Sequence, residues 1–104
     1  MANFHKIATT DQIPIGTMKS FLIGLDKVVV CHTNDGFYAV EDICSHDSAP
    51  ISDGHIDATG HIVCARHGAK FDCQSGEAKT PPAIVGIETF ELKIENNEIY
   101  IAID

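Results

Sequence analysis

The chain has 104 residues, 44% of them hydrophobic and 21% charged, and its formal net charge at pH 7 is −8. This length suits one small domain, and the acidic balance argues against a nucleic-acid partner, which would need clustered Lys and Arg. No apolar run approaches the roughly 20 residues that span a bilayer, and no export signal is present, so we expect a cytoplasmic protein without a membrane partner.

The first predicted elements are strands. Residues 17–23 and 27–32 are β-type runs on either side of a turn at residues 24–26, and Asn34-Asp35-Gly36 is a second turn, which leads into residues 37–40. No sustained helical period occurs anywhere in the chain. The pattern predicts three antiparallel strands.

Two short pairs of metal-ligand residues follow. Cys44 and His46 form a Cys-x-His pair, and Cys64 and His67 form a Cys-x-x-His pair. Cytoplasmic thiols stay reduced, so such pairs indicate metal ligands before they indicate disulfides. Two sulfurs and two nitrogens suit a [2Fe–2S] centre with histidines on one iron. Structural zinc accepts the same donors, but its common sites have a pair of cysteines followed by a pair of histidines. Each pair here contains one cysteine and one histidine, which favours iron.

The C-terminal part again predicts strands. Apolar and polar residues alternate through residues 88–95, which indicates one strand with one wet face, and Asn96-Asn97 then turns the chain into a strand at residues 99–103. Glycines and prolines concentrate in residues 42–86, as expected for loops. We therefore predict an all-β domain over residues 1–104, with a scaffold of residues 1–41 and 87–104 and an inserted cluster-binding subdomain of residues 42–86.

The ligand pairs are the residues that carry a family resemblance. The pattern Cys-x-His, then Cys-x-x-His-Gly, over residues 44–68 resembles the Rieske signature, and residues 76–82, with Pro81 and Pro82, resemble that family's proline-containing third loop. The resemblance implies a Rieske-like antiparallel β-sandwich or barrel with one [2Fe–2S] cluster. It assigns the inner iron to Cys44 and Cys64, the outer iron to His46 and His67, and a covering role to Pro81 and Pro82.

The chain departs from the Rieske proteins of respiratory complexes at four positions. Ala49 and Ala65 stand where those proteins carry a disulfide between the loops, and Ala69 and Phe71 stand where they carry hydroxyl groups. Fewer hydrogen-bond donors to the sulfurs make reduction harder. We expect a potential near the low end of the Rieske range, about −150 mV.

The sequence then resembles the ferredoxin component of multicomponent aromatic-ring dioxygenase systems. This resemblance implies a soluble one-electron carrier that is not itself an enzyme. An NAD(P)H-dependent flavoprotein reductase would reduce it, and a terminal oxygenase would take the electron. Two alternatives are the small Rieske-like subunit of an assimilatory nitrite reductase and a structural zinc-binding interaction domain.

The remaining notable residues have ordinary interpretations. Cys31 and Cys73 are expected to pack as small buried residues, with a disulfide or an extra metal ligand as less favoured alternatives. We expect no special role for the other histidines, which are His5, His32, His55 and His61. Four charged residues near the ligands suit either partner docking or plain solvation, and these are Arg66, Asp42, Asp47 and Asp53.

Overall fold

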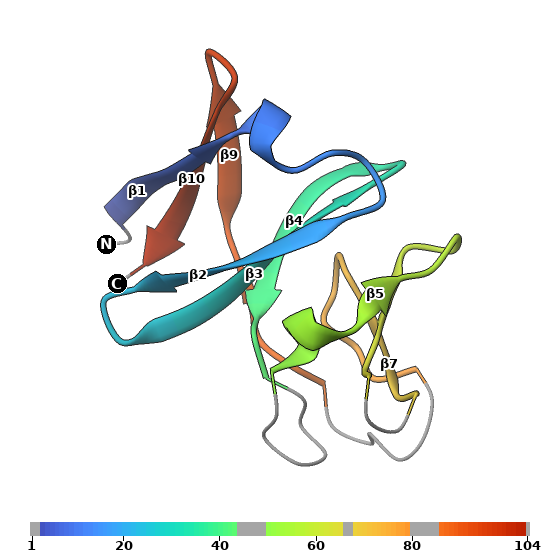
Figure 1. Cartoon of the computed structure of the whole chain (residues 1–104). Helices are drawn as coiled ribbons and strands as arrows, with labels where there is room; N and C mark the ends of the chain where they lie inside the picture. The colour runs from blue at the N-terminus through green and yellow to red at the C-terminus, as the bar shows by residue number, and fades with distance from the viewer. Residues whose placement is uncertain (1–2, 44–49, 66–67, 80–85, 104) are drawn as a thin grey trace.

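The computed structural model describes residues 3–43, 50–65, 68–79 and 86–103. Its strands form three antiparallel sheets (Figure 1). The sheets have the orders β1-β10-β9, β2-β3-β4-β8 and β5-β6-β7. The strands are β1 (Asn3–Thr9), β2 (Met18–Ile23), β3 (Asp26–Thr33), β4 (Gly36–Glu41), β5 (His55–Ile56), β6 (His61–Val63), β7 (Lys70–Asp72), β8 (Thr89–Phe90), β9 (Leu92–Glu95) and β10 (Glu98–Ile103).

Two short 3-10 helices complete the described elements, η1 (Thr10–Gln12) and η2 (Ile51–Asp53). Within the ranges that the structure describes, no helix is long and apolar enough to cross a membrane. The all-β antiparallel prediction is confirmed.

The predicted three-stranded unit is present as β2, β3 and β4. Ile23 pairs with Asp26 across a two-residue turn, and Thr33 pairs with Gly36 across the next one. Gly24 in the first turn has a φ of +63°, a conformation that glycine adopts without steric cost. Local turn chemistry and β-type runs therefore specify this part of the fold.

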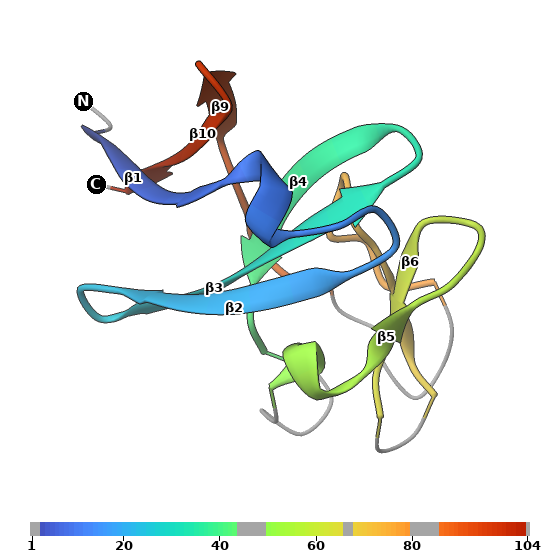
Figure 2. The ribbon, with the colours of Figure 1, turned by 45° about the horizontal axis from the view of Figure 1, so that its top comes forward.

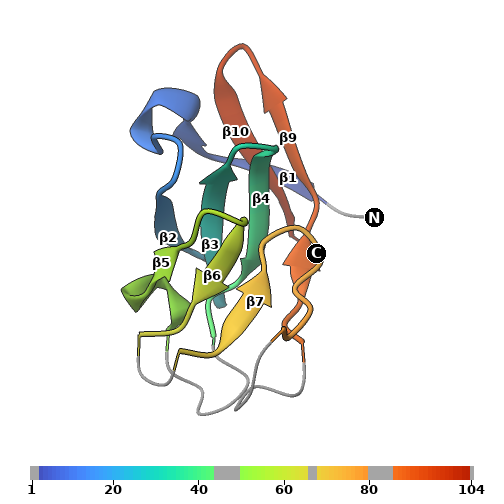
Figure 3. The same cartoon turned by 90° about the vertical axis from the view of Figure 1, so that its right-hand side faces the viewer.

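Strand β3 is the centre of the molecule because both of its faces are buried. Val28 and Val30 pack in one apolar core with residues of β10, whereas Val29 and Cys31 pack in a second core with residues of β6 and β7. Figures 1 and 2 show the β2–β3–β4 sheet between the other two sheets, and in Figure 3 β5, β6 and β7 lie in front of it. A strand buried on both faces explains the unbroken apolar run of Val28, Val29 and Val30.

The prediction of a single strand over residues 88–95 is wrong. Strand β8 pairs with β4, the strand is interrupted at Glu91, and β9 pairs with β10 in another sheet. The Glu91 carbonyl accepts a hydrogen bond from the backbone N–H of Ala102 at 2.9 Å, which fixes the crossover. The hairpin that follows is confirmed, because Asn96 and Asn97 form its turn with φ values of 53° and 65°.

Candidate metal centre

The second ligand pair begins at the end of strand β6. The backbone N–H of Cys64 donates to the Ala69 carbonyl at 2.7 Å, and the N–H of Gly68 donates to the Cys64 carbonyl at 3.0 Å. Gly68 has a φ of +71°, which favours glycine at this tight return. The hairpin turns the Cys64 side chain inward, where it is 2% exposed. Arg66 and His67 lie outside the described residues.

The first ligand pair lies on a segment whose base is fixed by a buried carboxylate. Asp42 is 7% exposed and accepts two hydrogen bonds from Ser52, one from the backbone N–H at 2.9 Å and one from the hydroxyl at 2.8 Å. Ile51, next to Ser52, is fully buried in the core that also contains Cys64. These contacts hold together the residues that precede and follow the first ligand segment. Cys44, His46 and Asp47 lie outside the described residues.

A glycine brings the two ligand segments into direct contact. A Cβ atom added at Gly54 would lie 1.8 Å from the Val63 carbonyl oxygen and 3.2 Å from the Ala65 backbone nitrogen. Any side chain at this position would force the first segment away from the second. Gly54 therefore sets the close approach of the chain that follows the first ligand segment to the hairpin that carries Cys64.

The base of the third loop is held in a similar way. The backbone N–H of Ile87 donates to the Gly76 carbonyl at 2.8 Å, and a Cβ atom added at Gly76 would lie 2.1 Å from the Ile87 carbonyl oxygen. Gly76 also has a φ of +74°. The third loop thus begins and ends at neighbouring positions, Gly76 and Ile87. Pro81 and Pro82 themselves lie outside the described residues.

One of the four predicted ligands, Cys64, lies within the described residues. Among the described residues no three His, Cys, Asp or Glu side chains converge on a metal position, because three of the four predicted ligands fall outside them. The remaining one, Cys64, has a free, buried thiol in the same core as Ile51, which follows the first ligand segment. A thiolate in this position fits the inner side of a two-iron centre.

Cys31 and Cys73 are buried neighbours in the same core as Cys64. Their exposed fractions are 0% and 1%, and both thiols are free, so the disulfide alternative is not realised here. A hydrogen bond with Cys73, followed by burial, raises the pKa of the Cys31 thiol. Both residues pack as the sequence predicted, as small apolar groups in the core.

A network around Asp57 supports the hairpin that carries Cys64. Burial acts to raise the pKa of the Asp57 carboxyl, but hydrogen bonds from the Thr59 hydroxyl and from the backbone N–H groups of His61 and Thr59, together with Lys70, lower it well below its usual range. The Lys70 ammonium lies 3.2 Å from the carboxylate. Asp57 therefore links the β5–β6 turn to strand β7.

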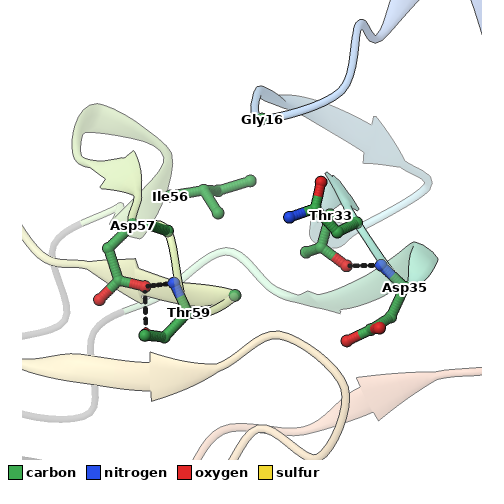
Figure 4. Close-up of a pocket in the computed structure, with 9 residues that line it drawn as sticks. Gly16, Thr33, Asp35, Ile56, Asp57 and Thr59 are labelled. Carbon is green, nitrogen blue, oxygen red and sulfur yellow. Dashed lines mark hydrogen bonds between the residues drawn. The ribbon is translucent and has the colours of Figure 1, made fainter.

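A cavity of about 340 Å³ lies beside this turn, away from Cys64. Figure 4 shows Asp57 and Thr59 on one side of it and Thr33 and Asp35 on the other. The Thr59 N–H and hydroxyl donate to Asp57, and the Asp35 N–H donates to the Thr33 hydroxyl oxygen. These polar groups stabilise their own turns, so the cavity is not the metal site.

The described residues form a small antiparallel β protein in which one predicted metal ligand, Cys64, is buried in the core at the end of strand β6. The chain belongs to the Rieske [2Fe-2S] domain family, whose model matches residues 3–91, and its cofactor is a Rieske-type [2Fe–2S] cluster. It is 31% identical over 99 residues to the ferredoxin component of biphenyl 2,3-dioxygenase from Rhodococcus jostii (strain RHA1), covering 95% of this chain and 92% of that protein.

Two solved structures are similar along nearly the whole chain. The ferredoxin of carbazole 1,9a-dioxygenase from Nocardioides aromaticivorans IC177 has a TM-score of 0.92 and 27% identity, covering 98% of this chain and 99% of that one. A complex of reduced oxygenase and oxidized ferredoxin in carbazole 1,9a-dioxygenase has a TM-score of 0.88 and 30% identity, covering 95% and 92%. The relatives are electron carriers, and the chain is likewise an electron-transfer protein rather than a catalytic enzyme.

Proposed function

We propose that this chain carries single electrons from an NAD(P)H-dependent flavoprotein reductase to the terminal oxygenase of an aromatic-ring dioxygenase system in the cytoplasm. The observation that carries the proposal is the Cys64 thiol, buried in the same core as Ile51 and Ile87, in a chain whose relatives are ferredoxin components of such systems. The nitrite reductase and zinc alternatives are not favoured, because the relatives are ferredoxin components and the family binds a [2Fe–2S] cluster.

The four predicted ligands divide the work between the buried and the exposed side of the site. Cys44 and Cys64 would hold the cluster from the inside, and His46 and His67 from the outside. When bound, such a cluster takes up and gives back one electron. This division agrees with a domain in which residues 42–86 form a cluster-binding subdomain on a scaffold of residues 1–41 and 87–104.

The residues around Cys64 exclude water and limit movement. Ile51, Ile62 and Phe71 are fully buried in the core that Cys64 joins, and the Asp42–Ser52 contact fixes the neighbouring segment. Electron transfer is fast when the site changes little between its two charge states, so a rigid, dry surrounding suits a carrier.

The same surroundings support a low potential. Ala69 and Phe71 are both fully buried, and neither side chain has a hydrogen-bond donor. Added negative charge at the sulfurs of the reduced cluster would therefore find fewer donors than in Rieske proteins with hydroxyl groups at these positions. We propose a potential of about −150 mV.

Electron-transfer assays with purified components test the function. The dithionite-reduced holoprotein is mixed with the oxygenase components of the biphenyl, naphthalene and carbazole systems, and re-oxidation of the carrier is followed by its absorbance. We expect rapid oxidation by at least one of them, and rapid reduction by a partner reductase with NADH. A carrier that keeps its cluster but exchanges electrons with none of these partners would contradict the proposal.

The ligands are tested by one exchange. His67→Cys should retain a cluster but lower its potential sharply, because thiolate donates more charge than neutral imidazole. Low-temperature EPR should also move from the lower average g value of a histidine-ligated centre toward that of an all-cysteine one. An unchanged potential would remove His67 from the coordination sphere.

A further inference from the structure

We propose that a surface patch beside the first ligand segment is where the terminal oxygenase docks, through a basic surface with an apolar centre. We call it the leucine–carboxylate patch, and it consists of Leu22, Leu25, Asp26, Glu41, Asp53 and Glu88. The inference rests on the proposed function and adds to it the place and chemistry of the contact with the oxygenase.

The apolar part of the patch is two leucines of the β2–β3 hairpin. Leu25 in the turn is 99% exposed and Leu22 in β2 is 69% exposed, the two highest values among the large exposed hydrophobic residues described. Leu22 pairs with Lys27, so the Leu22 side chain projects from the same face of the β2–β3–β4 sheet as Val29. Val29 is covered by residues of β6 and β7, whereas Leu22 lies beyond the part of the face that they cover. Large apolar side chains kept in water commonly mark an interaction surface.

The charged part of the patch is a group of carboxylates without counterions. Asp26, Glu41 and Glu88 line a recess of about 250 Å³ together with Leu25, and within the described residues none of the three forms an ion pair. Asp42 also reaches this recess, but its oxygens accept hydrogen bonds from Ser52. Lys27 supplies one positive charge to the lining of the recess, which is therefore net negative.

Acidic residues elsewhere on the described surface are compensated only in part. Four carboxylates away from the patch have lysine partners, in the pairs Lys6–Glu98, Lys70–Asp57, Lys79–Glu77 and Lys93–Glu95, whereas Asp11, Asp35 and Glu91 have none among the described residues. What sets the patch apart is that three unpaired carboxylates share one recess with the fully exposed Leu25. A Lys or Arg of a partner would supply the missing charge.

The patch adjoins the two described ends of the first ligand segment. Ile43 and Pro50, the described residues on either side of the segment with Cys44 and His46, form part of the wall of the same recess. A second recess, lined by Leu22 and Asp53, shares Lys27, Asp42 and Pro50 with the first, so the patch is continuous. Figure 1 shows the β2–β3 turn at the left edge of the molecule, on the side away from β5 and β7.

The test uses the oxygenase component, from the three systems named above, that the wild-type holoprotein reduces fastest. The patch variant is Asp26→Asn/Glu41→Gln/Glu88→Gln. The matched control is Asp11→Asn/Asp35→Asn/Glu95→Gln, which removes the same charge from η1, from the β3–β4 turn and from the end of β9. Iron content and midpoint potential are measured first, so that only carriers with intact clusters are compared. Electron transfer is then followed by stopped flow at about 20 mM and about 500 mM NaCl.

We expect the patch variant to react about tenfold more slowly than the control at low salt, and the difference to disappear at high salt because the charges are then screened. Leu25→Ser should slow the reaction about threefold at both salt concentrations, since apolar contact is not screened. Lys27→Gln provides an independent check of sign, because removing the cation should speed the reaction about twofold at low salt.

Equal rates for the patch and control variants would overturn the inference. So would a patch variant that is slow with the reductase but normal with the oxygenase, because the occupant would then be the reductase. If the wild-type carrier reduces none of the oxygenases, the proposed function itself fails, and this inference fails with it.

Discussion

Replacing Asp42 by Ala should strongly destabilise the base of the first ligand segment. The buried carboxylate accepts two hydrogen bonds from Ser52, at 2.9 and 2.8 Å. Hydrogen bonds to charged groups contribute about 1.5 to 3 kcal/mol each. Losing both, with some recovery as water enters, should lower the free energy of unfolding by about 3 kcal/mol. For a domain of this size that corresponds to a fall in Tm of about 12 to 24 °C.

The assay is urea unfolding followed by circular dichroism, together with the rate of iron release to a chelator. Ser52→Ala is the matched partner, because it removes the hydroxyl donor but keeps the backbone N–H, and we expect it to cost about 1.5 kcal/mol. The double variant should cost no more than Asp42→Ala alone, since both changes remove one shared contact. If Asp42→Ala were no less stable than Ser52→Ala, the view of Asp42 as the clamp of this segment would be refuted.

Three further predictions concern Gly54, Ala69 and Asp57. Gly54→Ala should destabilise by about 3 kcal/mol through the clash with Val63, whereas Gly60→Ala, which has open space and only an unfavourable φ, should cost about 1 kcal/mol in the same urea assay. Ala69→Ser should raise the midpoint potential, by at most about 65 to 130 mV if its hydroxyl bonds the reduced cluster, and voltammetry showing no rise would contradict the donor argument. Folding lowers the pKa of Asp57 from 3.8, so the ionised carboxylate stabilises the protein above that pH, and this stabilisation is lost as the pH falls below it. The difference in the free energy of unfolding between the wild-type apoprotein and Asp57→Asn should therefore become smaller below about pH 4. A difference that stays the same in acid would exclude a role of Asp57 ionisation in stability.

The parts of the fold that local signals specify are those that the sequence predicts. Strands β2 to β4 follow from their β-type runs and from two turns rich in Gly, Asn and Asp. Strand β1 was not predicted, because Ala8 is its one buried residue and its apolar pattern is correspondingly weak. The chain there is held mainly by backbone pairing with β10, which leaves little mark on side-chain order.

The error at residues 88–95 has a different cause. Phe90 and Leu92 both pack against the core that contains Ile99 and Ile101, so the apolar alternation continues through the break at Glu91. What changes there is the hydrogen-bonding partner, from β4 to β10. Periodicity reports which side is buried but carries no information about the neighbouring strand.

At the metal centre too, the sequence pattern carries no information about contacts that form only on folding. The spacing of Cys and His predicts the kind of metal centre, but the residues that hold the ligand segments in place carried no signal of their own. Gly54 looked like one loop glycine among several, and Asp42 like an ordinary acidic loop residue. Their roles depend on Val63 and Ser52, which are distant in sequence and near only after folding.

Strand β3 connects the site to the rest of the molecule. Its residues Val29 and Cys31 belong to the core that contains Cys64, while Val28 and Val30 belong to the opposite core. Because close-packed cores transmit displacement, a shift at Cys64 would have to move a strand that is held on both faces. The chain thus braces the ligand side of a small protein with a strand that is buried on both faces, which is the arrangement that a carrier with little reorganisation requires.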